Sequence, residues 1–114
     1  MSPDSTSSGF NKLAQSKWLE PWSQVENDSG LEDELKREVS PRHPLYGIEA
    51  KAIARGREDD FLFALADGRC ALVHLTWKRE SSADWPWTVF FADFETWRTE
   101  GMLPDHEYFL REEK

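Results

Sequence analysis

The sequence contains a single cysteine, Cys70, so an internal disulfide framework is excluded and a reducing cytoplasm is the compartment that fits best. It also has no run of about 18 apolar residues, which excludes a membrane-spanning helix of ordinary length. The first residues show neither the basic nor the apolar stretch of a secretory signal. We therefore expect a cytoplasmic protein with no membrane association.

Glycine-rich phosphate-binding loops are missing as well, since neither GxGxxG nor GxxxxGK[ST] occurs among the six glycines. Basic residues are the minority, with 14 lysines and arginines against 22 acidic residues and a net charge of −8. A protein that binds nucleic acid through its phosphates needs a clustered positive field. The composition therefore predicts no nucleic-acid partner.

The 114 residues correspond to one domain that can hold a core without disulfides or a metal. Residues Ser2–Gly9 are rich in serine and poor in apolar residues, which predicts a disordered tail over residues 1–9. The remaining residues, 10–114, are expected to form a single α+β domain.

Two helices are predicted before the sheet. Apolar residues recur at helical spacing from Phe10 to Leu19 and end at Pro21, and a second apolar stripe follows over Leu31–Val39. Helix starts are also indicated by two capping-box patterns, at Ser23 with Glu26 and at Ser29 with Glu32. Lys36 and Arg37 lie near the C-terminal end of Leu31–Val39, where they suit the helix dipole, and Pro41 and Pro44 end this helix.

The middle of the chain changes to strand periodicity. Apolar and polar residues largely alternate over Ile48–Arg55, which is typical of a half-buried strand, whereas Phe61–Ala66 is apolar on both faces and indicates a strand inside a sheet. Asp67-Gly68 predicts a hairpin with a type I′ turn, which leads into a third strand over Cys70–Trp77. A fourth strand is possible at Thr88–Phe91.

The C-terminal part again has helical signals. Asp93 is a plausible N-cap for a short helix over Phe94–Glu100, with Gly101 as its stop and a separate last segment after Pro104. The predicted fold is therefore α+β: an antiparallel meander of three to four strands, with N-terminal helices and a C-terminal helix packed on it.

The segment from Asp59 to Trp77, DDFLFALADGRCALVHLTW, resembles small uncharacterised bacterial proteins. These proteins share a similar "DG…A-V-HLTW" hairpin, a following Trp-Pro pair and a C-terminal "PDHE", so the resemblance covers about Pro44 to Phe109. It implies a bacterial, cytoplasmic origin and no particular activity. No catalytic residue is implied by it.

Catalytic and metal-binding patterns are weak. His43, His74 and His106 are far apart in sequence, and Cys70 lies about 13 Å from His74 along a strand, so we expect no metal site and no cofactor. His74 lies within an apolar strand, where it is either held structurally by a carboxylate or a carbonyl, or acts as a general base. The carboxylates of Asp59, Asp60 and Asp67 fit turns better than a catalytic cluster.

Six tryptophans are too many for a core of this size to enclose with ease. Trp77, Trp85 and Trp87 flank one polar connection, so either they close the edge of the core or they bind a partner. With the acidic charge, this predicts a small interaction protein that recognises a basic protein, of the inhibitor or immunity type. The alternative is a small-molecule-binding domain or an enzyme with a pocket centred on His74.

Overall fold

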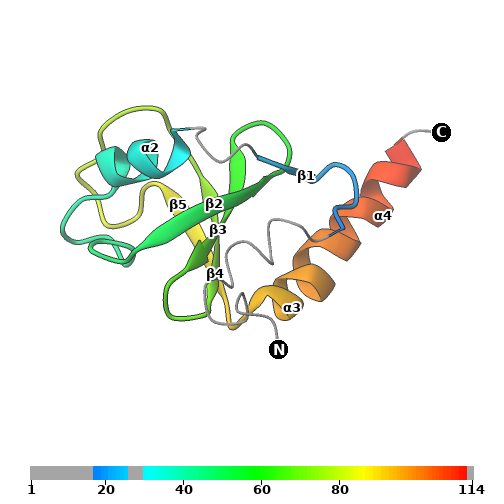
Figure 1. Ribbon diagram of the computed structural model, residues 1–114. Coiled ribbons are helices and arrows are strands. Elements are labelled where there is room, and N and C mark those ends of the chain that lie inside the picture. The colour runs from blue at the N-terminus through cyan, green and yellow to red at the C-terminus, as the bar shows by residue number, and fades with distance from the viewer. Residues whose placement is uncertain (1–16, 26–29, 113–114) are drawn as a thin grey trace.

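The computed structural model describes residues 17–25 and 30–112, and these form an α+β fold on a five-stranded antiparallel sheet (Figure 1). The strands lie in the sheet in their sequence order, which confirms the predicted meander. The strands are β1 (Ser23–Gln24), β2 (Ala50–Arg55), β3 (Asp60–Leu65), β4 (Cys70–His74) and β5 (Trp87–Phe91). The sheet therefore exceeds the expected three to four strands, because the short β1 pairs with the end of β2.

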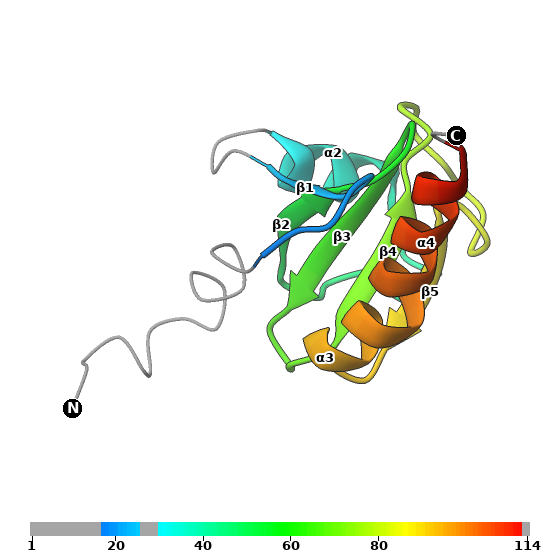
Figure 2. The ribbon, with the colours of Figure 1, turned by 90° about the vertical axis from the view of Figure 1, so that its right-hand side faces the viewer.

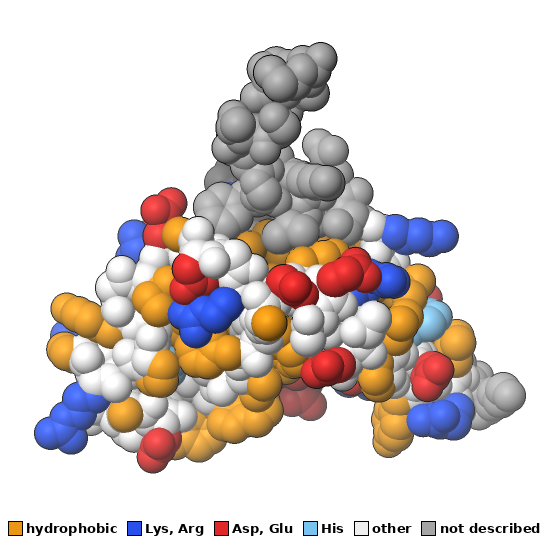
Figure 3. Space-filling model, turned by 90° about the horizontal axis from the view of Figure 1, so that it is seen from below, with side chains coloured by type: hydrophobic (Ala, Val, Ile, Leu, Met, Phe, Trp, Pro, Cys, Tyr) orange, Lys and Arg blue, Asp and Glu red, His pale blue; other side chains and the backbone are white. Residues whose placement is uncertain are grey.

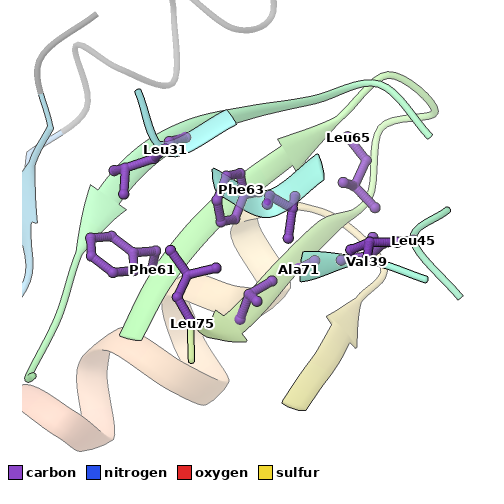
Figure 4. Close-up of a cluster of buried hydrophobic side chains, with 11 residues drawn as sticks. Leu31, Val39, Leu45, Phe61, Phe63, Leu65, Ala71 and Leu75 are labelled. Carbon is purple, nitrogen blue, oxygen red and sulfur yellow. The ribbon is translucent and has the colours of Figure 1, made fainter. Parts of the chain in front are cut away.

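The sheet is covered on both faces, by α2 (Leu31–Glu38) and by the C-terminal helix (Figure 2). This explains why β3, the central strand, is apolar on both sides, as the sequence indicated. On the α2 face, Leu31 and Val39 point into a core that includes Phe61 and Phe63 (Figure 4), and Leu35 belongs to the same buried cluster. The predicted helix over Leu31–Val39 is thus confirmed to within one residue.

The central hairpin forms where it was predicted, but its turn differs. Ala64 pairs with Cys70, and the chain reverses over the three residues from Ala66 to Gly68, of which Gly68 alone has a positive φ, at 95°. A type I′ turn needs two positive φ angles, so that prediction is wrong. A three-residue loop needs a left-handed conformation at its last position only, and glycine provides it without strain.

A β-bulge breaks the simple alternation predicted for β2. The register shifts between Ala52 and Ala54, so that Ala52 packs in the α2 core while Ile53 and Ala54 both pack on the other face. The strand is consequently buried on both sides rather than half-buried. The bulge inserts one extra residue into the strand, and the side chains after it therefore change faces. A strict alternation of apolar and polar residues in the sequence does not predict this change.

The C-terminal helix is continuous, contrary to the predicted break. α3 (Phe94–Trp97) passes through the π turn η2 (Arg98–Met102) into α4 (Leu103–Glu112). Asp93 caps its start, as predicted, by accepting a hydrogen bond of 2.7 Å from the Thr96 N–H. Gly101 does not end the helix, and Pro104 is the second residue of α4, two positions after the end of the π turn, where the wider backbone accommodates a residue that lacks an N–H.

Two predictions on the N-terminal third concern residues outside the described part of the chain: the disordered tail at Ser2–Gly9 and the start of the first helix. The described end of that predicted helix, at Trp18–Leu19, is not helical, so the prediction is wrong there. Trp18 instead packs edge-on against Phe94 and Trp97 of the C-terminal helix. Of the capping boxes, Ser23 lies in β1, and α2 begins after Gly30 with no side-chain cap.

Charged side chains of both signs are interspersed with hydrophobic ones on the face seen in Figure 3. None of the helices in the described residues is both long and apolar enough to cross a membrane.

Candidate functional site

The end of β4 is shaped by a buried carboxylate of α2. The strand was predicted to reach Trp77 but ends at His74, and Thr76 and Trp77 turn away from the sheet. Their backbone N–H groups donate to the two oxygens of Glu38, at 2.8 and 2.7 Å. Glu38 has no exposed surface, so this carboxyl fixes the direction in which the chain leaves the sheet.

Burial raises the pKa of the Glu38 carboxyl to about 7, and its hydrogen bond with Glu34 adds to this effect. The N–H groups of Thr76 and Trp77 act in the opposite direction but do not prevent the rise. The pKa of Glu34 is lowered, first by the hydrogen bond with Glu38 and then by Arg37. Below a pH of about 7 the proton of the pair is therefore on Glu38, whose O–H donates a hydrogen bond to the Glu34 carboxylate.

Trp77 has a positive φ of 62°, which is rare for a bulky side chain. Its ring packs edge-on against Phe61, with centroids 6.0 Å apart, and its indole N–H donates to Asp59 Oδ1 at 2.8 Å. These contacts hold one side of the ring, while 47% of the residue remains exposed.

Trp85 and Trp87 stand on either side of Pro86, which is fully buried. The Pro86 carbonyl accepts a hydrogen bond of 2.8 Å from Nε2 of the buried His43. Because Nδ1 of this histidine accepts the Leu45 N–H at 3.0 Å, the ring proton is on Nε2. The segment is thus anchored at its centre, and Trp85 and Trp87 remain 45% and 50% exposed.

His74 is held by a carboxylate. Its Nδ1 lies 2.8 Å from Asp60 Oδ1, on the neighbouring strand, and both side chains are about one-third exposed, at 37% and 35%. On the other side of β4, His74 is paired with Trp87 of the neighbouring strand β5. The structure thereby brings His74, Trp77, Trp85 and Trp87 to one end of the sheet.

Two open hollows separate the indole rings at this end of the sheet. The first, of about 380 Å³, lies between Trp77 and Trp85 and is lined also by Asp59, His74 and Lys78. The second, of about 480 Å³, lies between Trp85 and Trp87. Trp85 is therefore the wall that both hollows share, and we refer to Trp77, Trp85 and Trp87 together as the indole surface.

The described residues contain no group of three or more His, Cys, Asp or Glu side chains that could hold a metal ion. His43 is hydrogen-bonded to the Pro86 carbonyl, and His106 Nδ1 lies 2.6 Å from the Glu20 carbonyl oxygen. Within these residues, neither histidine shares a ligand cluster with His74. Asp67 bonds Arg69 in the turn beyond β3, whereas Asp59 and Asp60 lie at the start of this strand.

Cys70 is buried, and burial raises the pKa of its thiol to about 11, with Asp93 adding to the effect. A thiol with such a pKa stays protonated at neutral pH and is not a nucleophile.

Sequence reasoning missed the two residues that orient the indole surface, Glu38 and His43. For Glu38 a signal exists, since it follows Leu31 by seven positions and Leu35 by three, which places it on the apolar stripe of α2. A carboxylate on such a stripe must find buried hydrogen-bond donors. Nothing around His43, which precedes Pro44, indicates its partner.

Comparison of the chain with protein-family models, with curated proteins and with solved structures found no match. The function is therefore inferred from the contacts and charges of this site.

Proposed function

We propose that the chain is a small acidic interaction protein that recognises a basic protein partner through the indole surface. The observation that carries the proposal is the exposure of Trp77, Trp85 and Trp87, at 47%, 45% and 50%, on segments whose backbones are anchored by buried groups. Rigid, half-exposed aromatic side chains are the anchors that dominate protein interfaces, at about 2 kcal/mol or more each.

The chemistry of the first hollow favours a cationic side chain of the partner. Trp77 and Trp85 offer ring faces for a cation–π contact, and the Asp59 carboxylate lies beside them. Glu80 lines the same hollow, and the whole chain carries a net charge of −8. This field would accelerate association with a basic protein and would weaken with salt.

The biological setting that we propose is an inhibitor or immunity-type protein of the bacterial cytoplasm. The resemblance of the segment from Asp59 to Trp77 to small bacterial proteins supports the origin. The single, buried Cys70 supports a reducing compartment. A tight inhibitor needs a pre-organised surface, and the hydrogen bonds of Glu38 and His43 supply it.

The test is retention of a partner from native bacterial lysate by the immobilised full chain, at low and high salt. Trp85→Ala and Trp87→Ala should each abolish retention and leave the melting temperature within about 2 °C, because half-exposed rings contribute little to the core. Tyr108→Ala is the matched control, since this tyrosine is 55% exposed on α4, and it should retain the partner. A melting temperature that drops by several degrees in both tryptophan variants would assign these rings to the core instead.

A second candidate, a small-molecule site or an enzyme centred on His74, is favoured by the contact between His74 and Asp60. The carboxylate holds the proton on Nδ1, which leaves Nε2 as a base beside the first hollow. The Thr76 hydroxyl in the lining is already bonded to Glu38 and to the Lys78 carbonyl, so it is not poised as a nucleophile. Retention that is lost in His74→Ala but unchanged in Trp85→Ala and Trp87→Ala would favour this candidate.

A further inference from the structure

A basic hollow lies beside the C-terminal end of α2, in contrast to the acidic composition of the chain. It has a volume of about 630 Å³ and is lined by four basic side chains: Lys36, Arg37, Arg42 and Arg79. They come from three separate segments, which are α2, the turn after it and the connection between β4 and β5 that passes α2 (Figure 1). The fold, and not the local sequence, brings these charges together.

Three of the four charges have no acidic partner in the part of the chain that the structure describes. Arg37 is paired with Glu34, but within residues 17–25 and 30–112 no ion pair involves Lys36, Arg42 or Arg79. Glu80 is the carboxylate in the lining. Like charges in one hollow repel each other and focus a positive potential inside it, and a bound anion would relieve this repulsion.

The donor groups and the walls define the class of anion. Guanidinium groups match the oxygens of a phosphate in a two-point geometry, and three of the four cations are arginines. The remaining wall includes Val39, Pro41 and Tyr46, a residue that is 57% exposed and whose ring can contact an organic group. The volume lies in the range of small-molecule sites. A long polyanion is disfavoured, because the net charge of −8 repels it outside the hollow.

We propose that the basic hollow binds a small organic phosphate, with its phosphate group on Arg42 and Arg79 and its organic part against Tyr46. Glu80 lines both this site and the first hollow of the indole surface, and the other lining residues of the two differ. The proposal does not depend on the partner of the indole surface.

The test is a calorimetric titration of the full chain with phenyl phosphate, and separately with inorganic phosphate and with phenol. Phenyl phosphate should bind more tightly than either of its parts. Arg42→Ala and Arg79→Ala should each weaken it about tenfold or more, because each removes a charged hydrogen bond. Both arginines are exposed, so the variants should fold, and their melting curves check this.

The matched control is Arg111→Ala, which removes the same charge from an exposed position on α4 and should bind phenyl phosphate like the wild type. The proposal is overturned if phenyl phosphate shows no saturable binding, or if Arg111→Ala weakens it as much as Arg42→Ala. It is equally overturned if inorganic phosphate, or a single-stranded oligonucleotide in a parallel titration, binds more tightly than phenyl phosphate.

Discussion

The backbone N–H of Trp77 donates a hydrogen bond of 2.7 Å to Oε2 of Glu38, 39 positions earlier in the chain. Glu38 is the fully buried last residue of α2, and Trp77 carries a half-exposed ring of the indole surface. Trp77 has left the sheet and has a φ of 62°, so strand pairing no longer satisfies its N–H. The buried carboxyl replaces that partner and thereby determines where the ring is presented.

Glu38 should make the stability of the protein fall as the pH rises from about 4.5 to about 7. Its pKa is raised from 4.5 to about 7 in the folded state, so the folded protein binds more protons than the unfolded chain in this range. The loss should be on the order of 2 kcal/mol in the free energy of unfolding, measured by urea denaturation at pH 5 and pH 8.

Glu38→Gln provides the comparison, because it keeps the shape and removes the titration. Its free energy of unfolding should change less between pH 5 and pH 8 than that of the wild type. The lowered pKa of Glu34 affects stability in a different pH range, since its contribution is lost only as the pH falls through and below about 4.5. Equal pH dependence in the two proteins would contradict the assignment.

Gly68→Val should destabilise the protein by about 1 kcal/mol or more, because an L side chain with β-branching is strained at a φ of 95°. No atom lies within 4 Å of the position of an added Cβ, so the loss would be conformational rather than steric. Gly68→Asn is the control, since asparagine tolerates the left-handed region and should lose less. Thermal melting of the two variants measures the difference, and equal losses would argue against a conformational origin.

Gly101→Ala should also destabilise the protein, although alanine is the better helix former by about 1 kcal/mol. An added Cβ would lie 2.8 Å from Nε1 of Trp97, whose ring is fully buried and cannot move aside freely. We expect a net loss of about 1–3 kcal/mol in urea denaturation, as for other overpacked sites. Glu100→Ala, at the exposed neighbouring position, should be close to neutral. A stabilised Gly101→Ala variant would show that the helix adjusts around Trp97.

Chelation should leave the melting temperature unchanged. His43, His74 and His106 have separate partners, and the described part of the chain holds no cluster of ligand side chains for a metal. A structural metal would contribute folding free energy directly. The check is thermal melting before and after chelation, with metal analysis of the same sample. A stoichiometric ion whose removal unfolds the protein would refute the prediction.

Local patterns in the sequence were sufficient for much of the fold. The stripe of α2, the two apolar faces of β3 and the cap at Asp93 depend on residues within a few positions of one another. Such patterns follow from the geometry of one helix or strand, so they can be predicted before the fold is known. The hairpin between β3 and β4 could also be predicted from a local pattern, but its turn type could not.

Tertiary structure alone decided the rest, because each remaining feature depends on contacts between distant segments. Gly101 lies against Trp97 inside the C-terminal helix and does not end it, and β1 forms where the N-terminal segment meets the end of β2. The Trp77 and Pro86 partners of Glu38 and His43 are 39 and 43 residues away, and the arginines of the basic hollow come from α2, the turn after it and the connection between β4 and β5. The sequence therefore determined which tryptophans flank the connection between β4 and β5, whereas the buried side chains of Glu38 and His43 decided how the segments that carry their rings are held.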